Sequence, residues 1–187
     1  MSQRFAIIDT ALAGLKVLQR HRLVDARGYF ERLYCNEELD ALVGDRAIVQ
    51  VNHTLTREKG SVRGLHFQRA PHAEMKIITC LRGEVFDVAA DLRRGSPTFL
   101  HWHGEVLSAD NARSLVVPEG FAHGFQTLTP DCELIYFHTA AFAAAAEGGL
   151  NPQDPGLAVA WPLPVTALSD RDQSHPVLDE TFTGLSL

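Results

Sequence analysis

Apolar and polar residues alternate along much of this 187-residue chain, and this alternation limits the possible folds more than any other feature of the sequence. The clearest runs lie at 47–51, 84–91 and 134–138. Successive side chains of a β-strand point to opposite faces, so a period of two predicts strands with two distinct faces. Turn signals separate the runs, at Arg82-Gly83, 94–97, 118–120 and 129–131. Many short strands with regular turns predict a β-sandwich or jelly roll.

Helical signals are confined to two segments. Asn36 is a suitable cap for a helix in which Leu39, Leu42 and Val43 share one face and Gly44 ends the helix. The alanine-rich segment 140–147 has high helix propensity and could form a second short helix. No internal repeat or low-complexity linker divides the chain, so we expect a single domain over residues 1–187, of the all-β class with a few short helices.

Charge and cysteine content exclude several classes of function. The chain carries 17 basic and 23 acidic residues, a net charge of -6, so we expect no binding to a nucleic-acid backbone. A local cluster of arginines could still hold one small anion. The N-terminal residues contain no long apolar run, so we expect neither a signal peptide nor a membrane span. Three widely spaced cysteines form no disulfide framework, which indicates a reducing cytoplasm.

Two histidines stand out by their neighbours. His66 lies between large apolar residues, which is typical of a packed core histidine. Gly64 before it permits close backbone approach and Arg63 adds positive charge, so a ligand-facing histidine is the alternative. His123 follows the turn at 118–120, which places it among the first residues of a strand, near the mouth of a barrel.

Polar residues also interrupt the predicted strands. Lys76 lies in an apolar run, where it either extends from an edge strand, the commoner case, or points into a polar cavity. Tyr136 shares a face with His138, and the pattern alone predicts a core tyrosine whose hydroxyl is hydrogen-bonded. Asp87 and Asp91 share one strand face, and such a pair is typical of a solvated face.

One motif offers a metal site as an alternative. His101, His103 and Glu105 occupy alternate positions of one predicted strand, and these residue types are metal ligands. Neighbours along a strand diverge too little to enclose a tetrahedral ion by themselves, so the pattern favours a polar outer face.

The order of motifs along the chain resembles the dTDP-4-dehydrorhamnose 3,5-epimerase family, the cupin-like enzymes of deoxysugar nucleotide biosynthesis. The likeness extends from about residue 7 to residue 176. It is carried by the residues at 25–30, 50–52, 63–68, 76, 87–93, 96–99, 118–125, 136, 154–155, 161–162 and 168–172. Each block is short, but their shared order is specific.

The resemblance implies a cupin-type jelly roll that works as a homodimer with exchanged N-terminal strands. It implies a nucleotide-linked 4-keto-6-deoxyhexose as substrate, inversion at C3 and/or C5, and no metal or redox cofactor. His66 would be the general base and Asp172 its orienting partner. Tyr136 would be the acid on the opposite face of the sugar, and Lys76 would lie near the C4 oxygen. The substrate-binding residues implied are Arg27, Phe30, Gln50, Asn52, Arg63, His123 and Phe142.

The chemistry is consistent with these roles. C3 and C5 both adjoin the C4 carbonyl, so their protons are weakly acidic, and removing one leaves an enolate that a cation such as Lys76 stabilises. Inversion needs a base on one face of the sugar and an acid on the other. A histidine held by a carboxylate is a suitable base near neutral pH.

Two positions depart from the family pattern and keep alternatives open. Phe142 stands where the family has a tyrosine in the sugar pocket, so epimerisation at C3 alone is an alternative. Arg32 replaces an acidic residue of the nucleotide site, so the identity of the nucleotide base stays open.

A metal-dependent cupin oxygenase using residues 101–105 is a less favoured alternative. A non-catalytic sugar-binding cupin is another, and the intact acid and base set argues against it.

Overall fold

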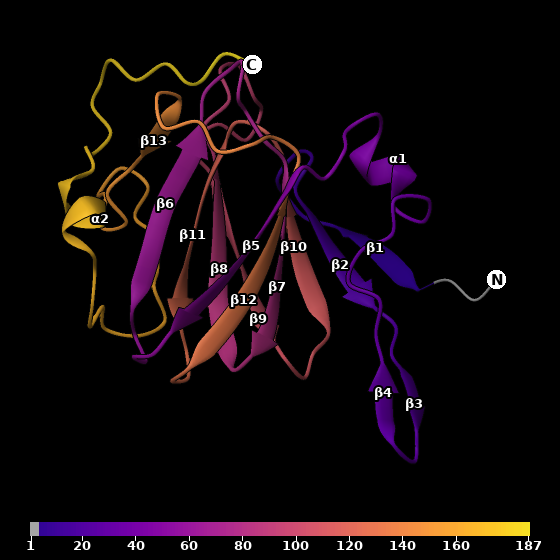
Figure 1. The fold of residues 1–187 in the computed structure, drawn as a ribbon. Coiled ribbons are helices and arrows are strands. Elements are labelled where there is room, and N and C mark those ends of the chain that lie inside the picture. The colour runs from indigo at the N-terminus through magenta and orange to yellow at the C-terminus, as the bar shows by residue number, and fades with distance from the viewer. Residues whose placement is uncertain (1–3) are drawn as a thin grey trace.

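The computed structural model describes residues 4–187 and shows two antiparallel sheets that face each other (Figure 1). The six-stranded sheet has the spatial order β1 (Phe5–Asp9), β2 (Lys16–Arg20), β10 (Arg113–Val117), β7 (Lys76–Arg82), β12 (Cys132–His138) and β5 (Gln50–Thr56). The five-stranded sheet has the order β13 (Glu147–Gly149), β6 (Val62–Gln68), β11 (Phe121–Thr127), β8 (Glu84–Asp91) and β9 (Trp102–Ser108). The all-β prediction is confirmed.

The alternating runs locate most strands correctly. The run at 84–91 coincides with β8, and the run at 134–138 lies inside β12. The run at 47–51 is displaced, because β5 begins only at Gln50. All four turn signals fall between consecutive strands, as predicted.

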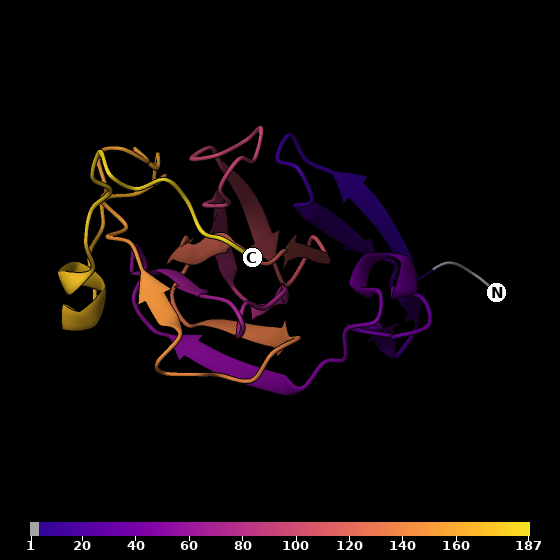
Figure 2. The same cartoon turned by 90° about the horizontal axis from the view of Figure 1, so that it is seen from above.

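Apolar side chains fill the space between the sheets and also form clusters on the outer face of each sheet. The cluster between the sheets includes Ile78, Leu115, Phe125 and Leu134, all buried. The C-terminal segment covers the outer face of the five-stranded sheet, and α1 with its flanking residues covers part of the other outer face. Seen from above, the C-terminal segment and the N-terminal strands lie on opposite sides of the barrel (Figure 2).

The helical predictions are partly wrong. Helix α1 (Asp40–Val43) starts after Leu39 rather than after Asn36, and it ends at Gly44 as expected. The segment 140–147 forms no helix, because Phe142 and Ala143 donate their backbone N–H groups to the side chains of two glutamines. Its end, Glu147, begins β13. A second short helix, α2 (Asp170–Ser174), carries Asp172.

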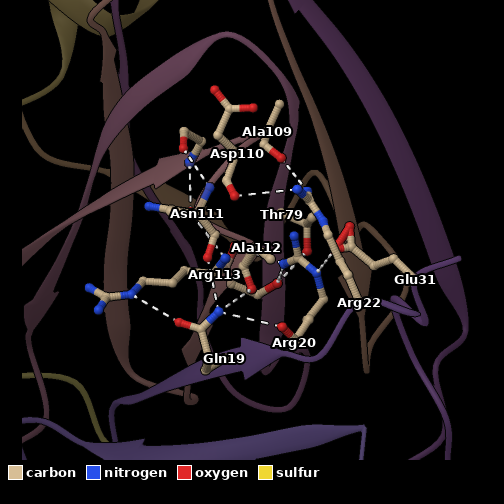
Figure 3. Close-up of polar contacts among 12 residues, drawn as sticks. Gln19, Arg20, Arg22, Glu31, Thr79, Ala109, Asp110, Asn111, Ala112 and Arg113 are labelled. Carbon is tan, nitrogen blue, oxygen red and sulfur yellow. Dashed lines mark hydrogen bonds and ion pairs between the residues drawn. The ribbon is translucent and has the colours of Figure 1, made fainter. Parts of the chain in front are cut away.

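A two-stranded hairpin of β3 (Leu23–Asp25) and β4 (Gly28–Phe30) projects away from the barrel (Figure 1). Its base is clamped at Glu31, whose carboxylate accepts from Arg20 Nε at 3.0 Å and from Arg22 Nε at 3.3 Å (Figure 3). Arg20 also donates to the Arg113 carbonyl at 2.8 Å. Charge-assisted hydrogen bonds between nearly buried groups fix the direction in which the hairpin leaves the barrel.

Asp91 contradicts the prediction of a solvated face. Its side chain is fully buried at the end of β8, where it accepts hydrogen bonds from Arg93, Ser96 and Thr98. Burial alone would raise the pKa of Asp91, but these hydrogen bonds lower it to about 2. The carboxylate is therefore a structural anchor for the turn that follows β8.

No helix within residues 4–187 is long and apolar enough to cross a membrane.

Candidate active site

A cavity of about 230 Å³ opens between the two sheets. Eight of the residues implied by the sequence line it: Gln50, Asn52, Arg63, His66, Lys76, His123, Tyr136 and Phe142. They come from strands of both sheets and from the 140–147 segment, so the fold gathers residues that lie far apart in the sequence.

His66 and Asp172 form a hydrogen-bonded pair at the wall of this cavity. His66 Nε2 lies 2.7 Å from Asp172 Oδ1, and the carboxylate is buried. Gly64 lets β6 lie close to β11, because a Cβ there would lie 2.6 Å from the Gly124 backbone. The Gly64 N–H donates to Asp172 Oδ2 at 3.3 Å. His66 lines the cavity rather than packing into the core, as the ligand-facing alternative requires.

Asp172 is held in place by the start of α2. Ser169 caps the helix by accepting from the Asp172 N–H at 3.0 Å. Burial alone would raise the pKa of Asp172, but the hydrogen bond and charge of His66 outweigh it and leave the pKa below its usual value. The carboxylate is therefore ionised at neutral pH and suited to stabilise a protonated imidazole.

Tyr136 lines the cavity from the opposite sheet. It lies on β12, whereas His66 lies on β6. Its hydroxyl is 3.4 Å from Thr54 Oγ1, and burial raises the pKa of the phenol above its ordinary value. A phenol with a raised pKa keeps its proton at neutral pH and is available as a proton donor.

Lys76 lies on β7, a central strand, so the prediction of an edge strand is wrong. The ammonium reaches the cavity and forms an ion pair with Glu74 Oε1 at 3.1 Å. The other carboxylate oxygen of Glu74 contacts His138 Nδ1 at 2.8 Å. The sequence patterns assigned no role to Glu74 or His138. The strand face that His138 shares with Tyr136 could have indicated that His138 belongs to the site. Glu74 precedes β7 and is not part of any alternating run, so no feature of the sequence indicated it.

His123 pairs with a buried carboxylate that the sequence placed on a solvated face. His123 Nε2 lies 2.8 Å from Asp87 Oδ1, and Asp87 is completely buried. Burial raises the pKa of Asp87. The His123 ring meets the Tyr136 ring edge-on, with 6.2 Å between centroids. Strand β8 is covered on both faces, which is why the alternation of apolar residues misled the prediction for Asp87.

Two of the implied substrate-binding residues do not line the cavity of their own chain. Arg27 and Phe30 belong to the projecting hairpin. The Arg27 side chain is 90% exposed and Phe30 is 58% exposed.

The alternative metal motif is not assembled. His101 precedes β9, and Glu105 is engaged by Arg113 Nη1 at 2.6 Å. Within residues 4–187, the group that could hold a metal ion is His66, Asp172 and His175, whose ligand atoms lie within 4.8 Å of one another. An ion there would have to displace the hydrogen bond between His66 and Asp172.

Comparison with known proteins identifies the family of the chain. The family model described as dTDP-4-dehydrorhamnose 3,5-epimerase matches residues 9–180. The chain belongs to the dTDP-4-dehydrorhamnose 3,5-epimerase family. It is thus an isomerase by family, and the resemblance inferred from the motifs is confirmed.

Individual members of the epimerase family are similar over nearly their whole length. The dTDP-4-dehydrorhamnose 3,5-epimerase of Sinorhizobium fredii is 42% identical over 91% of this chain and 88% of its own. The dTDP-4-dehydrorhamnose 3-epimerase of Streptomyces niveus is 35% identical over 90% of this chain and 82% of its own. The Legionella pneumophila 3,5-epimerase, solved with dTDP-4-keto-L-rhamnose, superposes with a TM-score of 0.90 at 35% identity, covering 98% of this chain and 99% of that one. The cupin-type jelly roll is therefore confirmed.

Proposed function

We propose that the protein inverts C3 and C5 of a dTDP-linked 4-keto-6-deoxyhexose of the dTDP-4-dehydro-6-deoxyglucose type. The observation that carries the proposal is one cavity lined by His66 from one sheet and by Tyr136 from the other, with His66 hydrogen-bonded to Asp172 of α2. A base and an acid on opposite sides of a ring are what inversion at a carbon requires. The relatives supply the substrate class, since the Legionella enzyme is solved with a sugar of this kind.

Each inversion proceeds in two proton transfers. His66 Nε2 is engaged by Asp172, so Nδ1 is the nitrogen free to take the proton from the carbon next to the C4 carbonyl. The electron pair of the broken C–H bond moves into an enolate, whose oxygen Lys76 stabilises. The Tyr136 hydroxyl, which its raised pKa keeps protonated at neutral pH, then gives its proton to the same carbon from the opposite face.

The remaining cavity residues would hold the substrate. Arg63 lies at the rim, exposed, where a guanidinium suits a diphosphate. Gln50, Asn52, His123 and Phe142 would surround the sugar and the nucleotide. We further infer a cytoplasmic location, because all three cysteines are free.

We also infer a homodimer in which each hairpin completes the site of the other subunit. The cavity is smaller than the ~300–1,000 Å³ of typical ligand sites, so a nucleotide sugar would extend beyond it. Arg27 and Phe30 stand exposed on a hairpin whose base is fixed, where they could reach a second molecule. On the face of β5 that points away from the cavity, Val51 and Leu55 are exposed apolar side chains of the kind that dimer interfaces bury.

Epimerisation at C3 alone is the second candidate. Phe142 fills the space of the tyrosine expected in the sugar pocket but offers no hydroxyl. The Streptomyces niveus relative is named as a 3-epimerase, so both outcomes occur among similar proteins.

The deciding experiment is NMR of dTDP-4-keto-6-deoxyglucose incubated with the protein in heavy water. Deuterium at both C3 and C5 is the expected result. Deuterium at C3 alone would establish the second candidate. Deuterium at neither carbon would contradict the proposed function.

A further inference from the structure

A row of polar side chains on the six-stranded sheet joins Lys76 to the backbone of Phe142. We name it the Glu74 chain. Its five links are Lys76 Nζ–Glu74 Oε1 at 3.1 Å, His138 Nδ1–Glu74 Oε2 at 2.8 Å, Asn52 Nδ2–His138 Nε2 at 3.2 Å, Gln50 Nε2–Asn52 Oδ1 at 3.3 Å and Phe142 N–Gln50 Oε1 at 2.9 Å. All five residues that supply side chains line the cavity. The proposed proton transfers give no role to Glu74 or His138.

The direction of each hydrogen bond is fixed from the Phe142 end. A backbone N–H can only donate, so Gln50 presents its oxygen to Phe142 and its amide nitrogen to Asn52. Asn52 accepts with its oxygen and therefore presents its own amide nitrogen to His138. His138 Nε2 must accept this hydrogen bond, so in a neutral His138 the proton resides on Nδ1.

Two donors consequently meet at residue 74. His138 Nδ1–H donates to one carboxylate oxygen, and the Lys76 ammonium, which can only donate, contacts the other. Only a side chain that accepts at both atoms satisfies this arrangement, and an ionised carboxylate does so. Burial alone would raise the pKa of Glu74, but the hydrogen bond from His138 and the charge of Lys76 leave it below its usual value.

Burial also makes the Glu74 chain rigid. The side chains of Glu74, His138 and Lys76 are only 8%, 9% and 13% exposed. Nearly buried polar groups are costly when unpaired, so these three hold one another in a single arrangement.

We propose that Glu74 and His138 are positioning residues, which fix the Lys76 ammonium in the cavity and couple it to the loop that carries Phe142. The inference rests on the proposed function for the role of Lys76 at the C4 oxygen. An isosteric amide at position 74 would have to turn its NH₂ toward either Lys76 or His138. The first choice loses the ammonium contact. The second reverses every later link and leaves the Phe142 N–H facing another donor.

The test begins with Glu74→Gln. We expect kcat for sugar epimerisation to fall about 10- to 100-fold, because a misplaced cation stabilises the enolate less well. The Kd for thymidine diphosphate should stay within about twofold, since the change lies on the sugar side of the site. Nitrogen NMR of labelled histidine should show the His138 proton on Nδ1 in the unaltered protein. In the variant, a proton on Nε2 marks the reversed chain, and a proton on Nδ1 marks the orientation that loses the ammonium contact.

A second substitution provides the matched rescue. Adding Asn52→Asp to Glu74→Gln places a carboxylate at position 52 in exchange for the one lost at position 74. A carboxylate can only accept hydrogen bonds. Every link is then satisfied again, with His138 donating from Nε2. We expect kcat of the double variant to exceed that of Glu74→Gln by about fivefold or more, and Asn52→Asp alone is the control for lost substrate contacts.

The outcomes separate this inference from the proposed function. Unaltered kcat in Glu74→Gln, or a proton on His138 Nε2 in the unaltered protein, would overturn the Glu74 chain. The histidine spectrum needs no substrate and no variant, so it decides the inference even if a variant fails to fold. Failure of the unaltered protein to exchange sugar protons would instead refute the proposed function.

Discussion

At the residue scale, the proposed chemistry depends on the two nitrogen atoms of one imidazole. Asp172 engages Nε2 of His66 and leaves Nδ1 for the substrate. Because the pKa of Asp172 lies below its usual value, the carboxylate stays charged at neutral pH and stabilises the imidazolium that forms when His66 takes a proton. In the proposed mechanism, we therefore expect the charge of Asp172, and not only its hydrogen bond, to contribute to turnover.

His66→Ala should abolish most turnover without unfolding the protein. We expect the rate to fall about 10²- to 10⁴-fold, the usual loss of a general base, while thymidine diphosphate still binds. The His66 side chain is 31% exposed, so its removal leaves no core cavity. Asp172→Asn keeps the shape but removes the charge and should give a smaller loss. Steady-state kinetics and calorimetric binding measure both, and an unchanged rate in His66→Ala would remove it from the role of base.

Phe142→Tyr tests what the missing hydroxyl does. The ring stands at the cavity mouth, 57% exposed, so a hydroxyl can be added there without steric conflict. If the protein inverts C3 alone, the added hydroxyl should raise the share of product inverted at C5, measured by NMR of the product mixture. Phe142→Leu is the control, since it changes the packing without adding a donor. An unchanged product ratio would make Phe142 a packing residue.

At the element scale, the sequence predicted strands better than it predicted their surroundings. The alternating run at 84–91 predicted both ends of β8 correctly, because alternation and turn signals depend only on residues that are close together in the sequence. The segment 140–147 was wrongly expected to be helical, because Gln50 and Gln68 capture its backbone N–H groups from distant strands. Helix propensity is a local quantity, and contacts made by residues far away in the sequence override it.

The same limit applies to the candidate site. Ordered motifs and the family resemblance identified eight of the residues that line the cavity, but not the partners of Lys76 and His123. Asp87 meets His123 only because β8 and β11 lie side by side, and no spacing along the chain encodes that pairing. Glu74 is only two residues from Lys76, but it precedes β7, so no alternation indicates where its side chain points.

Asp91→Asn should destabilise the turn after β8. The carboxylate accepts hydrogen bonds from three side chains while fully buried, so replacing it with an amide should lower the free energy of unfolding by about 3 kcal/mol at pH 7. Chemical denaturation measures this loss. Exposed Asp45→Asn is the control and should change stability by less than about 0.5 kcal/mol.

The pKa of Asp91 also predicts how stability depends on pH. The folded-state pKa is about 2, below that of the unfolded chain, so the unfolded chain binds more protons between about pH 4 and pH 2. The stabilisation by Asp91 is therefore present above pH 4 and is lost as the pH falls toward 2. Asp91→Asn should show a shallower decline over this window, and an equal slope in both proteins would contradict the assignment.

At the scale of the whole molecule, the hairpin and the cavity are two halves of one proposed site. The cavity holds the proposed acid, base and cation, whereas Arg27 lies in the turn between β3 and β4 and Phe30 lies on β4, in the hairpin that projects from the barrel (Figure 1). Glu31 fixes the direction of the hairpin through two arginines (Figure 3). A rigid arm with exposed apolar residues is costly to leave in water, and a second subunit would cover it.

Mixing two inactive variants tests whether the site is shared. One protomer carries His66→Ala, and the other carries Arg27→Ala with Phe30→Ala. Each alone should form a dimer of low activity. In a mixed dimer, one site combines an intact His66 with the intact hairpin of its partner, while the other site lacks both. Unfolding and refolding the mixture makes about half the dimers mixed, so about one quarter of all sites should be active.

The control is the same mixture without refolding, in which the protomers stay with their original partners and activity stays low. A hairpin that serves its own subunit gives no active site in either kind of dimer, because each protomer then carries a defect of its own. Recovery of roughly one quarter of the unaltered activity after refolding therefore requires exchange of the hairpin between subunits. Absence of recovery, with mixed dimers confirmed by native mass spectrometry, would place Arg27 and Phe30 outside the partner's site.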